Sequence, residues 1–157
     1  MTIYKSDAVV AGIMPDFTKA GVILCRSAEY VTADDEIVSA DTIQMVPIPN
    51  DAKILRIEMY HSDLPDGTTD VDVGYGGDAD AFMAGIDATG KAIRVWPGRC
   101  GSASTEDWEA TAGFLHTFTA DDTIDITFNK LGTKIPTSQH IKMAVYYKMI
   151  GTIADET

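Results

Sequence analysis

The sequence predicts an all-β protein, an antiparallel β-sandwich or jelly roll with one or two short helical turns and an extended N-terminal arm. Short segments in which apolar and polar residues alternate recur along the chain, and this period of two is typical of half-buried strands. Turn-forming Gly, Pro, Asn and Asp residues separate the segments. Long helical segments do not alternate with them, which disfavours a parallel α/β sheet. Antiparallel sheets that have one solvent-exposed face bury their apolar faces by packing against each other, which gives a sandwich.

The 157 residues suit one domain with a flanking segment at each end. We predict an extended arm over 1–19, a single β-sandwich domain over 20–150 and a polar tail over 151–157. The arm shows no sustained period, and its apolar residues have no periodic partner in their own segment. An arm folded onto its own domain, or a partly disordered tail, is the alternative. The candidate partner-binding residues, by packing or by strand addition, are Ile3, Tyr4, Val9, Val10, Ile13, Met14 and Phe17.

The first strands follow from short alternating runs. The apolar stretch at 22–31 fits one bent strand or two, and residues 42–48 alternate until Pro47 and Pro49 end the strand or place it at an edge. KILRIEMYH at 53–61 has the clearest period, with Leu55, Ile57 and Met59 on one face. TDVDVGY at 69–75 also alternates. Because a turn separates these two runs, we expect them to be neighbouring antiparallel strands.

The stretch VDVGYGGDADAFMAG at 71–85 begins as a strand and then breaks into glycines and aspartates. We interpret the part after Tyr75 as a connector. Its glycines let the backbone turn, and Phe82 and Met83 fold back as a plug over the end of the sandwich. A loop that binds a partner is the alternative.

The second half of the chain repeats the same signals. Residues 91–96, 114–119 and 123–129 are predicted strands, and STEDWEATA at 104–112 has weak capping-box spacing for one short helix. The longest alternating run is QHIKMAVYYKMI at 139–150. Its predicted buried residues are Ile141, Met143, Val145, Tyr147 and Met149.

The charge balance limits the partners. The formal net charge is −12, from 24 acidic and 12 basic residues, and the basic residues are scattered along the sequence. Because such a surface repels phosphate, we expect no nucleic-acid partner. No apolar run approaches the about 20 residues that span a bilayer, and residues 1–10 lack the order of a secretory signal. We therefore expect no membrane partner and synthesis in a cytoplasm.

The cysteines predict no disulfide framework. Cys25 lies in the apolar run GVILCR and is predicted to be a buried free thiol, whereas Cys100 lies in the loop PGRCGS. A bridge between them, or to another chain, stays an alternative because spacing does not test it.

No catalytic or cofactor motif stands out, so we expect no enzyme activity, no cofactor and no metal. The three histidines, His61, His116 and His140, lie far apart on different elements and lack zinc-ligand spacing. Trp96 and Trp108 fit buried anchors better than a sugar platform. Six aspartates lie close together in the sequence, and we interpret them as solvated residues of turns: Asp63, Asp66, Asp70, Asp72, Asp78 and Asp80. A structural Ca²⁺ site is the alternative.

Residues 40–95 resemble small virion structural proteins of tailed bacteriophages. Their pattern has a first strand ADTIQLVPIPxGAxILxV, an acidic strand ending in DVGxG, and then DxDxFxxG. The resemblance covers the C-terminal strands only generally and the N-terminal arm not at all. The matching positions here are 40–48, 52–57, 72–74, Gly76, Asp78, Asp80, Phe82 and Gly85.

This resemblance implies a β-sandwich or jelly-roll module of the head decoration, or cement, type, with no catalytic residue to transfer. It implies a virion protein on the head surface whose partner is the major capsid protein, and a homo-oligomer, with a trimer favoured. A tail, head–tail or fibre-base component is the first alternative, and a carbohydrate-binding module or small hydrolase is the second.

Overall fold

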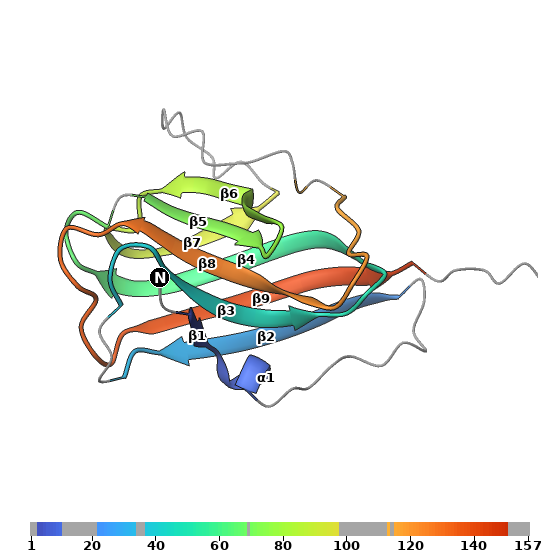
Figure 1. The fold of residues 1–157 in the computed structure, drawn as a ribbon, viewed down its shortest axis with the longest axis horizontal. Coiled ribbons are helices and arrows are strands. Elements are labelled where there is room, and N and C mark those ends of the chain that lie inside the picture. The colour runs from blue at the N-terminus through green and yellow to red at the C-terminus, as the bar shows by residue number, and fades with distance from the viewer. Residues whose placement is uncertain are drawn as a thin grey trace, which may run out of the picture.

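The computed structural model describes residues 3–10, 22–33, 37–68, 70–97, 113 and 115–150. Two β-sheets pack face to face in it, which confirms the predicted sandwich (Figure 1). We call the five-stranded sheet, in the order β1-β3-β8-β5-β6, sheet A. The four-stranded sheet, in the order β2-β9-β4-β7, is sheet B.

Neighbouring strands run antiparallel, except that β1 runs parallel to β3. One helical turn, α1 (Asp7–Val10), follows β1. Sheet A consists of β1 (Ile3–Lys5), β3 (Asp41–Ile48), β8 (Asp122–Lys130), β5 (Asp70–Tyr75) and β6 (Asp78–Ile86). Sheet B consists of β2 (Ile23–Val31), β9 (His140–Met149), β4 (Ala52–Leu64) and β7 (Gly90–Trp96).

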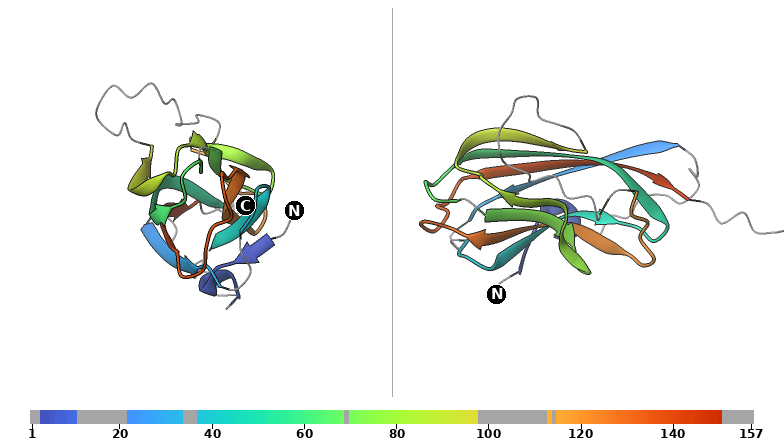
Figure 2. Two further views of the ribbon diagram at one scale, coloured as in Figure 1. Left: turned by 90° about the vertical axis from the view of Figure 1, so that its left-hand side faces the viewer. Right: turned by 90° about the horizontal axis from the view of Figure 1, so that it is seen from above.

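The core lies between the inward rows of the two sheets. The alternation predicted for β9 is confirmed, since its five predicted core residues are at most 5% exposed. Val71 and Val73 of β5 and Ile124 and Ile126 of β8 meet them from sheet A. Seen end-on, the sheets form two layers, and β1 with α1 lies along one side, next to β2 and β3 (Figure 2).

The predicted pairing of residues 53–61 with 69–75 is wrong. β4 pairs with β9 and β7 in sheet B, whereas β5 pairs with β8 and β6 in sheet A. The connection between them includes the turn at Pro65–Thr68, where Thr68 N–H donates to Pro65 O. It crosses from one layer to the other instead of closing a hairpin.

The predicted connector after Tyr75 is also wrong, because residues 78–86 form strand β6 and pair with β5. Phe82 and Met83 are fully buried, but they belong to a strand and not to a plug. Gly74 explains the tight hairpin: a Cβ at this position would lie 2.1 Å from Asp78 O. Only glycine lets the bulged start of β6 approach β5 this closely.

Smaller differences have local causes. The register of β4 against β9 shifts between Ile54 and Arg56, so Leu55 is half-buried and Ile54 takes the core position. In the predicted strand at 114–119, Thr117 forms one isolated bridge with Lys53, and Phe118 is buried. The predicted helix at 104–112 lies outside the described residues. No helix within the described part of the chain is long and apolar enough to cross a membrane.

Candidate interaction surface

The described part of the predicted arm lies on its own domain. β1 adds to the edge of sheet A, with Tyr4 opposite Ile43. Ser6 is fully buried; its N–H donates to Gln44 O at 2.9 Å and its hydroxyl donates to Met45 O. Because backbone and side-chain bonds both anchor Ser6, residues 3–10 adopt the alternative in which the arm folds back.

The candidate partner-binding residues divide into two groups. Tyr4 packs against the core with its ring centroid 6.1 Å from that of Tyr30, and Val9 is half-buried. Ile3 and Val10 stay exposed at 49% and 72%. Exposed apolar side chains on a strand edge and a helical turn are available to another protein. The remaining candidates, Ile13, Met14 and Phe17, lie outside the described residues.

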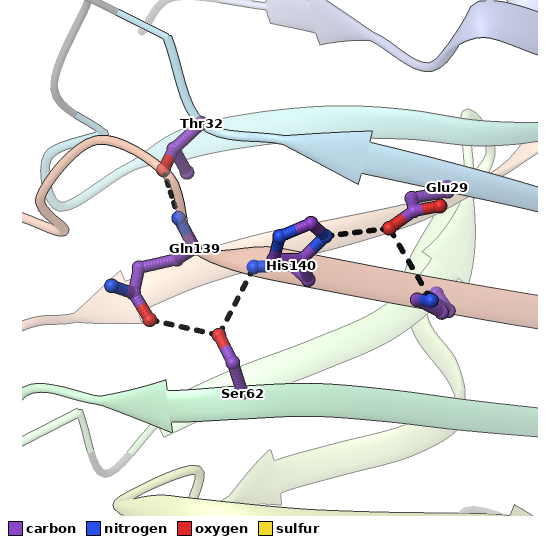
Figure 3. A network of polar contacts seen from close by, with 6 residues as sticks. Glu29, Thr32, Ser62, Gln139 and His140 are labelled. Atoms are coloured by element: carbon purple, nitrogen blue, oxygen red, sulfur yellow. Dashed lines mark hydrogen bonds and ion pairs between the residues drawn. The ribbon is translucent and has the colours of Figure 1, made fainter.

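A polar network fixes one end of sheet B (Figure 3). His140 Nδ1 lies 2.6 Å from Glu29 Oε1, and Lys142 Nζ lies 3.4 Å from the same oxygen. The hydrogen bond from His140, and then the charge of Lys142, hold the pKa of Glu29 below its ordinary value. Ser62 Oγ accepts from His140 N–H at 3.0 Å and donates to Gln139 Oε1 at 2.8 Å.

The same network continues into the connection before β9. Thr32 Oγ1 accepts from Gln139 N–H at 2.8 Å and donates to Pro136 O at 2.6 Å. These contacts join β2, β9 and β4 by side chains as well as by the backbone ladder. The outer face of sheet B is therefore held in one register at this end, although its exposed ion pairs contribute little stability.

One histidine lies in the core at the end of β4. His61 is 1% exposed, and its Nδ1 lies 3.2 Å from Ser62 O. Burial lowers its pKa. Its Nε2 has no hydrogen-bond partner in the described part of the chain, and the residue lines a cavity of about 10 Å³. The cavity holds at most one water, and apolar side chains form the rest of its wall: Met59, Leu64, Val71, Ala88, Ile126, Phe128 and Ile141.

The aspartates act in turns and ladders. Asn129 Nδ2 donates to Asp70 and Asp72, and Asp72 Oδ1 accepts from Gly85 N–H at 2.8 Å. A side-chain hydrogen bond with Asp80 raises the pKa of Asp78 at the start of β6. Within the described residues no three His, Cys, Asp or Glu side chains gather to hold a metal ion.

Cys25 lies on the outside of sheet B, whereas Trp96 lies in the core. The prediction that Cys25 is buried is wrong, because β2 is an edge strand and Cys25 lies on its outer face, opposite Tyr146. Trp96 is 1% exposed and packs on Phe82 at 4.9 Å between ring centroids, so it anchors the core and offers no sugar platform. Cys100 and Trp108 lie outside the described residues.

Comparison with known proteins shows the fold. No protein-family model matches the chain, and no curated protein does. A chain from the capsid of Ralstonia phage GP4 has a TM-score of 0.71 and 15% identity, over 96% of this chain and 99% of that one. A chain of the cyanophage Pam1 capsid asymmetric unit has a TM-score of 0.57 and 18% identity, over 87% and 91%.

A chain from the acid-stable capsid of Helicobacter pylori bacteriophage KHP30 has a TM-score of 0.53 and 14% identity, over 84% of this chain and 91% of that one. At these identities the likeness is one of fold. The sandwich described above is thus an architecture found in chains of phage capsid structures.

Proposed function

We propose that this protein is a bacteriophage virion structural protein, and within that class a capsid decoration (cement) protein. It binds the outer surface of the head and stabilises it by bridging subunits of the major capsid protein. The observation that carries the proposal is the likeness of almost the whole sandwich to chains of three phage capsid structures. The sequence resemblance over residues 40–95 points to the same class.

The size of the matched chain supports a role as a small added module. The chain from the phage GP4 capsid is matched over 99% of its length by 96% of this chain, so the two are of about equal length. A single sandwich of this size is thus a component of that capsid. We propose assembly as a homo-oligomer, with a trimer favoured, after synthesis in the host cytoplasm.

Labelling of purified virions tests this function. An antibody or a gold-labelled tag on the chain should give signal spread over the head. Signal confined to one vertex or to the tail would refute decoration and favour a tail, head–tail or fibre-base component, for which the same fold serves. Absence from the virion would refute the structural role itself.

The exposed apolar residues of the N-terminal segment should contact an adjacent subunit at the side of the sandwich. We expect the double variant Ile3→Asp/Val10→Asp to bind about tenfold more weakly to heads assembled without this protein, because it places charges in an apolar contact. Both changes keep the backbone bond from Val10 N–H to Ser6 O and leave the Tyr4–Tyr30 contact unaltered, so folding should persist. Cosedimentation with heads measures the effect.

A control is Leu115→Asp, which alters an exposed apolar residue (46%) outside β1, α1 and the strands of sheet B. It should bind as the parent does. Equal binding by the parent and by both variants would reject the role of the N-terminal segment while leaving decoration itself intact.

A further inference from the structure

The outer face of sheet B differs in charge from the molecule as a whole. Outward positions alternate with buried ones on its strands, and five of the twelve basic residues occupy them. Among the side chains whose burial the structure describes, Glu29 and Glu58 are the acidic ones on this face. The face is therefore positive on a chain of net charge −12. Its basic residues are Lys53 and Arg56 of β4, Lys91 of β7, and Lys142 and Lys148 of β9.

Two of these lysines oppose each other directly. Lys53 of β4 pairs with Lys148 of β9, and Ile23 of β2 pairs with Lys148 on its other side. These three residues form one row across neighbouring strands. Neither lysine makes an ion pair with another described residue. Like charges directly opposite on antiparallel strands are destabilising, so this row costs the isolated protein stability. An anionic group placed over it would remove the repulsion.

The rows beside the lysine pair have the composition of a protein interface. Tyr146 lies between Cys25 and Arg56 in the next row, and Tyr60 lies between Lys142 and Ile93 further along. Ile23 and Ile93, at the two edges, are 64% and 63% exposed. Tyrosine and arginine are enriched in protein interfaces, where apolar side chains form the centre of contact.

We propose that the outer face of sheet B is the surface that contacts the virion shell, and that its partner there is an acidic protein surface. This assignment rests on the proposed decoration function and names the side of the molecule that carries it. The asymmetry of charge supplies the orientation: an acidic shell attracts sheet B and repels the rest of the chain. The ordered network at Glu29, His140 and Ser62 keeps this face in one register before contact.

A nucleic acid is the less favoured occupant. Basic and aromatic side chains on a sheet are also a recognition surface for single-stranded RNA. The net charge of −12, however, repels a polyphosphate at long range. A nucleic acid on this face would also cover the carboxylates of Glu29 and Glu58. A folded protein surface presents separated carboxylates, which fit a face of separated lysines better.

Charge reversal on this face tests the proposal. The variant Lys142→Glu/Lys148→Glu is compared with Lys130→Glu/Lys134→Glu, which changes the net charge equally at the end of β8 and in the following connection. Both are mixed with heads assembled without this protein and sedimented. We expect the first variant to lose at least about tenfold in affinity and the second to stay within about twofold of the parent.

Salt dependence gives a second readout. Binding of the parent should weaken from about 0.1 M to about 1 M salt, as the screening length falls from about 10 to about 3 Å. If the parent binds heads and Lys142→Glu/Lys148→Glu binds equally well, the assignment of this face fails and decoration stands. If the parent itself does not bind, both fail.

Two further measurements separate other occupants. Binding of the parent to a single-stranded oligonucleotide at about 0.15 M salt, lost in Lys142→Glu/Lys148→Glu, would overturn the proposal in favour of nucleic acid. Light scattering compares the oligomeric state of the free parent with that of Lys142→Glu/Lys148→Glu. Oligomers of the parent but monomers of the variant would overturn the proposal in favour of self-association. Monomers or unchanged oligomers, with no oligonucleotide bound, support it.

Discussion

Replacing Phe82 with alanine is expected to lower the free energy of unfolding by about 3–5 kcal/mol, the usual cost of removing a buried phenylalanine. The ring is fully buried on β6 of sheet A and meets Trp96 of β7 in sheet B at 4.9 Å, with the rings tilted by 73°. The ring of Tyr75 also lies near it, with 6.3 Å between the two centroids. The loss should be large because this ring joins the two sheets along the side where β6 and β7 form their edges.

Urea denaturation measures the effect, as a lower midpoint with an unchanged slope. A suitable control is Ile93→Ala on β7, where the side chain is 63% exposed and little burial is lost. It should change the free energy by less than about 1 kcal/mol. A loss below about 1 kcal/mol for Phe82→Ala would contradict the packing described between β6 and β7.

The sequence predicts the fold class and most strands because a strand with one face in the core keeps its apolar alternation. β9 is such a strand, since every second residue from Ile141 to Met149 is buried. β6 is different: its register against β5 shifts twice, and Ala81, Phe82 and Met83 are buried in succession. Such a bulged strand loses its period of two, and its Ala, Met and Gly residues weaken the strand signal. The sequence pattern therefore indicates a connector where the structure has a strand.

Which strands pair, and which side chains share a surface, depends on the order of strands and not on sequence distance. The turn after β4 leads to the opposite sheet, so the two clearest neighbouring strands never pair. The same ordering brings together Lys53 and Lys148, which lie far apart in the sequence. A basic face thus forms from residues that look scattered. Cys25 is misjudged for a related reason, since an apolar run at a sheet edge leaves one face open.

A buried carboxyl on sheet A makes the stability depend on pH. Asp125 of β8 is 9% exposed, and burial raises its pKa to about 7, although the hydrogen bond from Thr123 Oγ1 at 2.5 Å opposes the shift. The nearby Asp122 raises this pKa further. A free aspartate ionises near pH 4. The unfolded chain therefore releases this proton between about pH 4 and 7 while the folded chain keeps it, so stability falls as pH rises through this window.

The variant Asp125→Asn should consequently be more stable than the parent above pH 7. A shift of about three pKa units corresponds to about 4 kcal/mol as an upper bound, and relaxation around the site reduces it, so we expect a gain of about 2 kcal/mol at pH 8. At pH 4 the gain should nearly vanish, because the carboxyl is then neutral in the fold and asparagine can still accept the bond from Thr123. Urea denaturation of both proteins at the two pH values measures the difference.

Comparing the variant with the parent at each pH removes the opposite contribution of His61. The lowered pKa of that buried imidazole makes both proteins lose stability as pH falls below about 6.5, and this term cancels in the difference. Asp66→Asn, at an exposed turn, controls for the loss of one negative charge. A gain for Asp125→Asn that is the same at pH 4 and pH 8 would show that packing, and not ionisation of a buried carboxyl, sets the cost at this position.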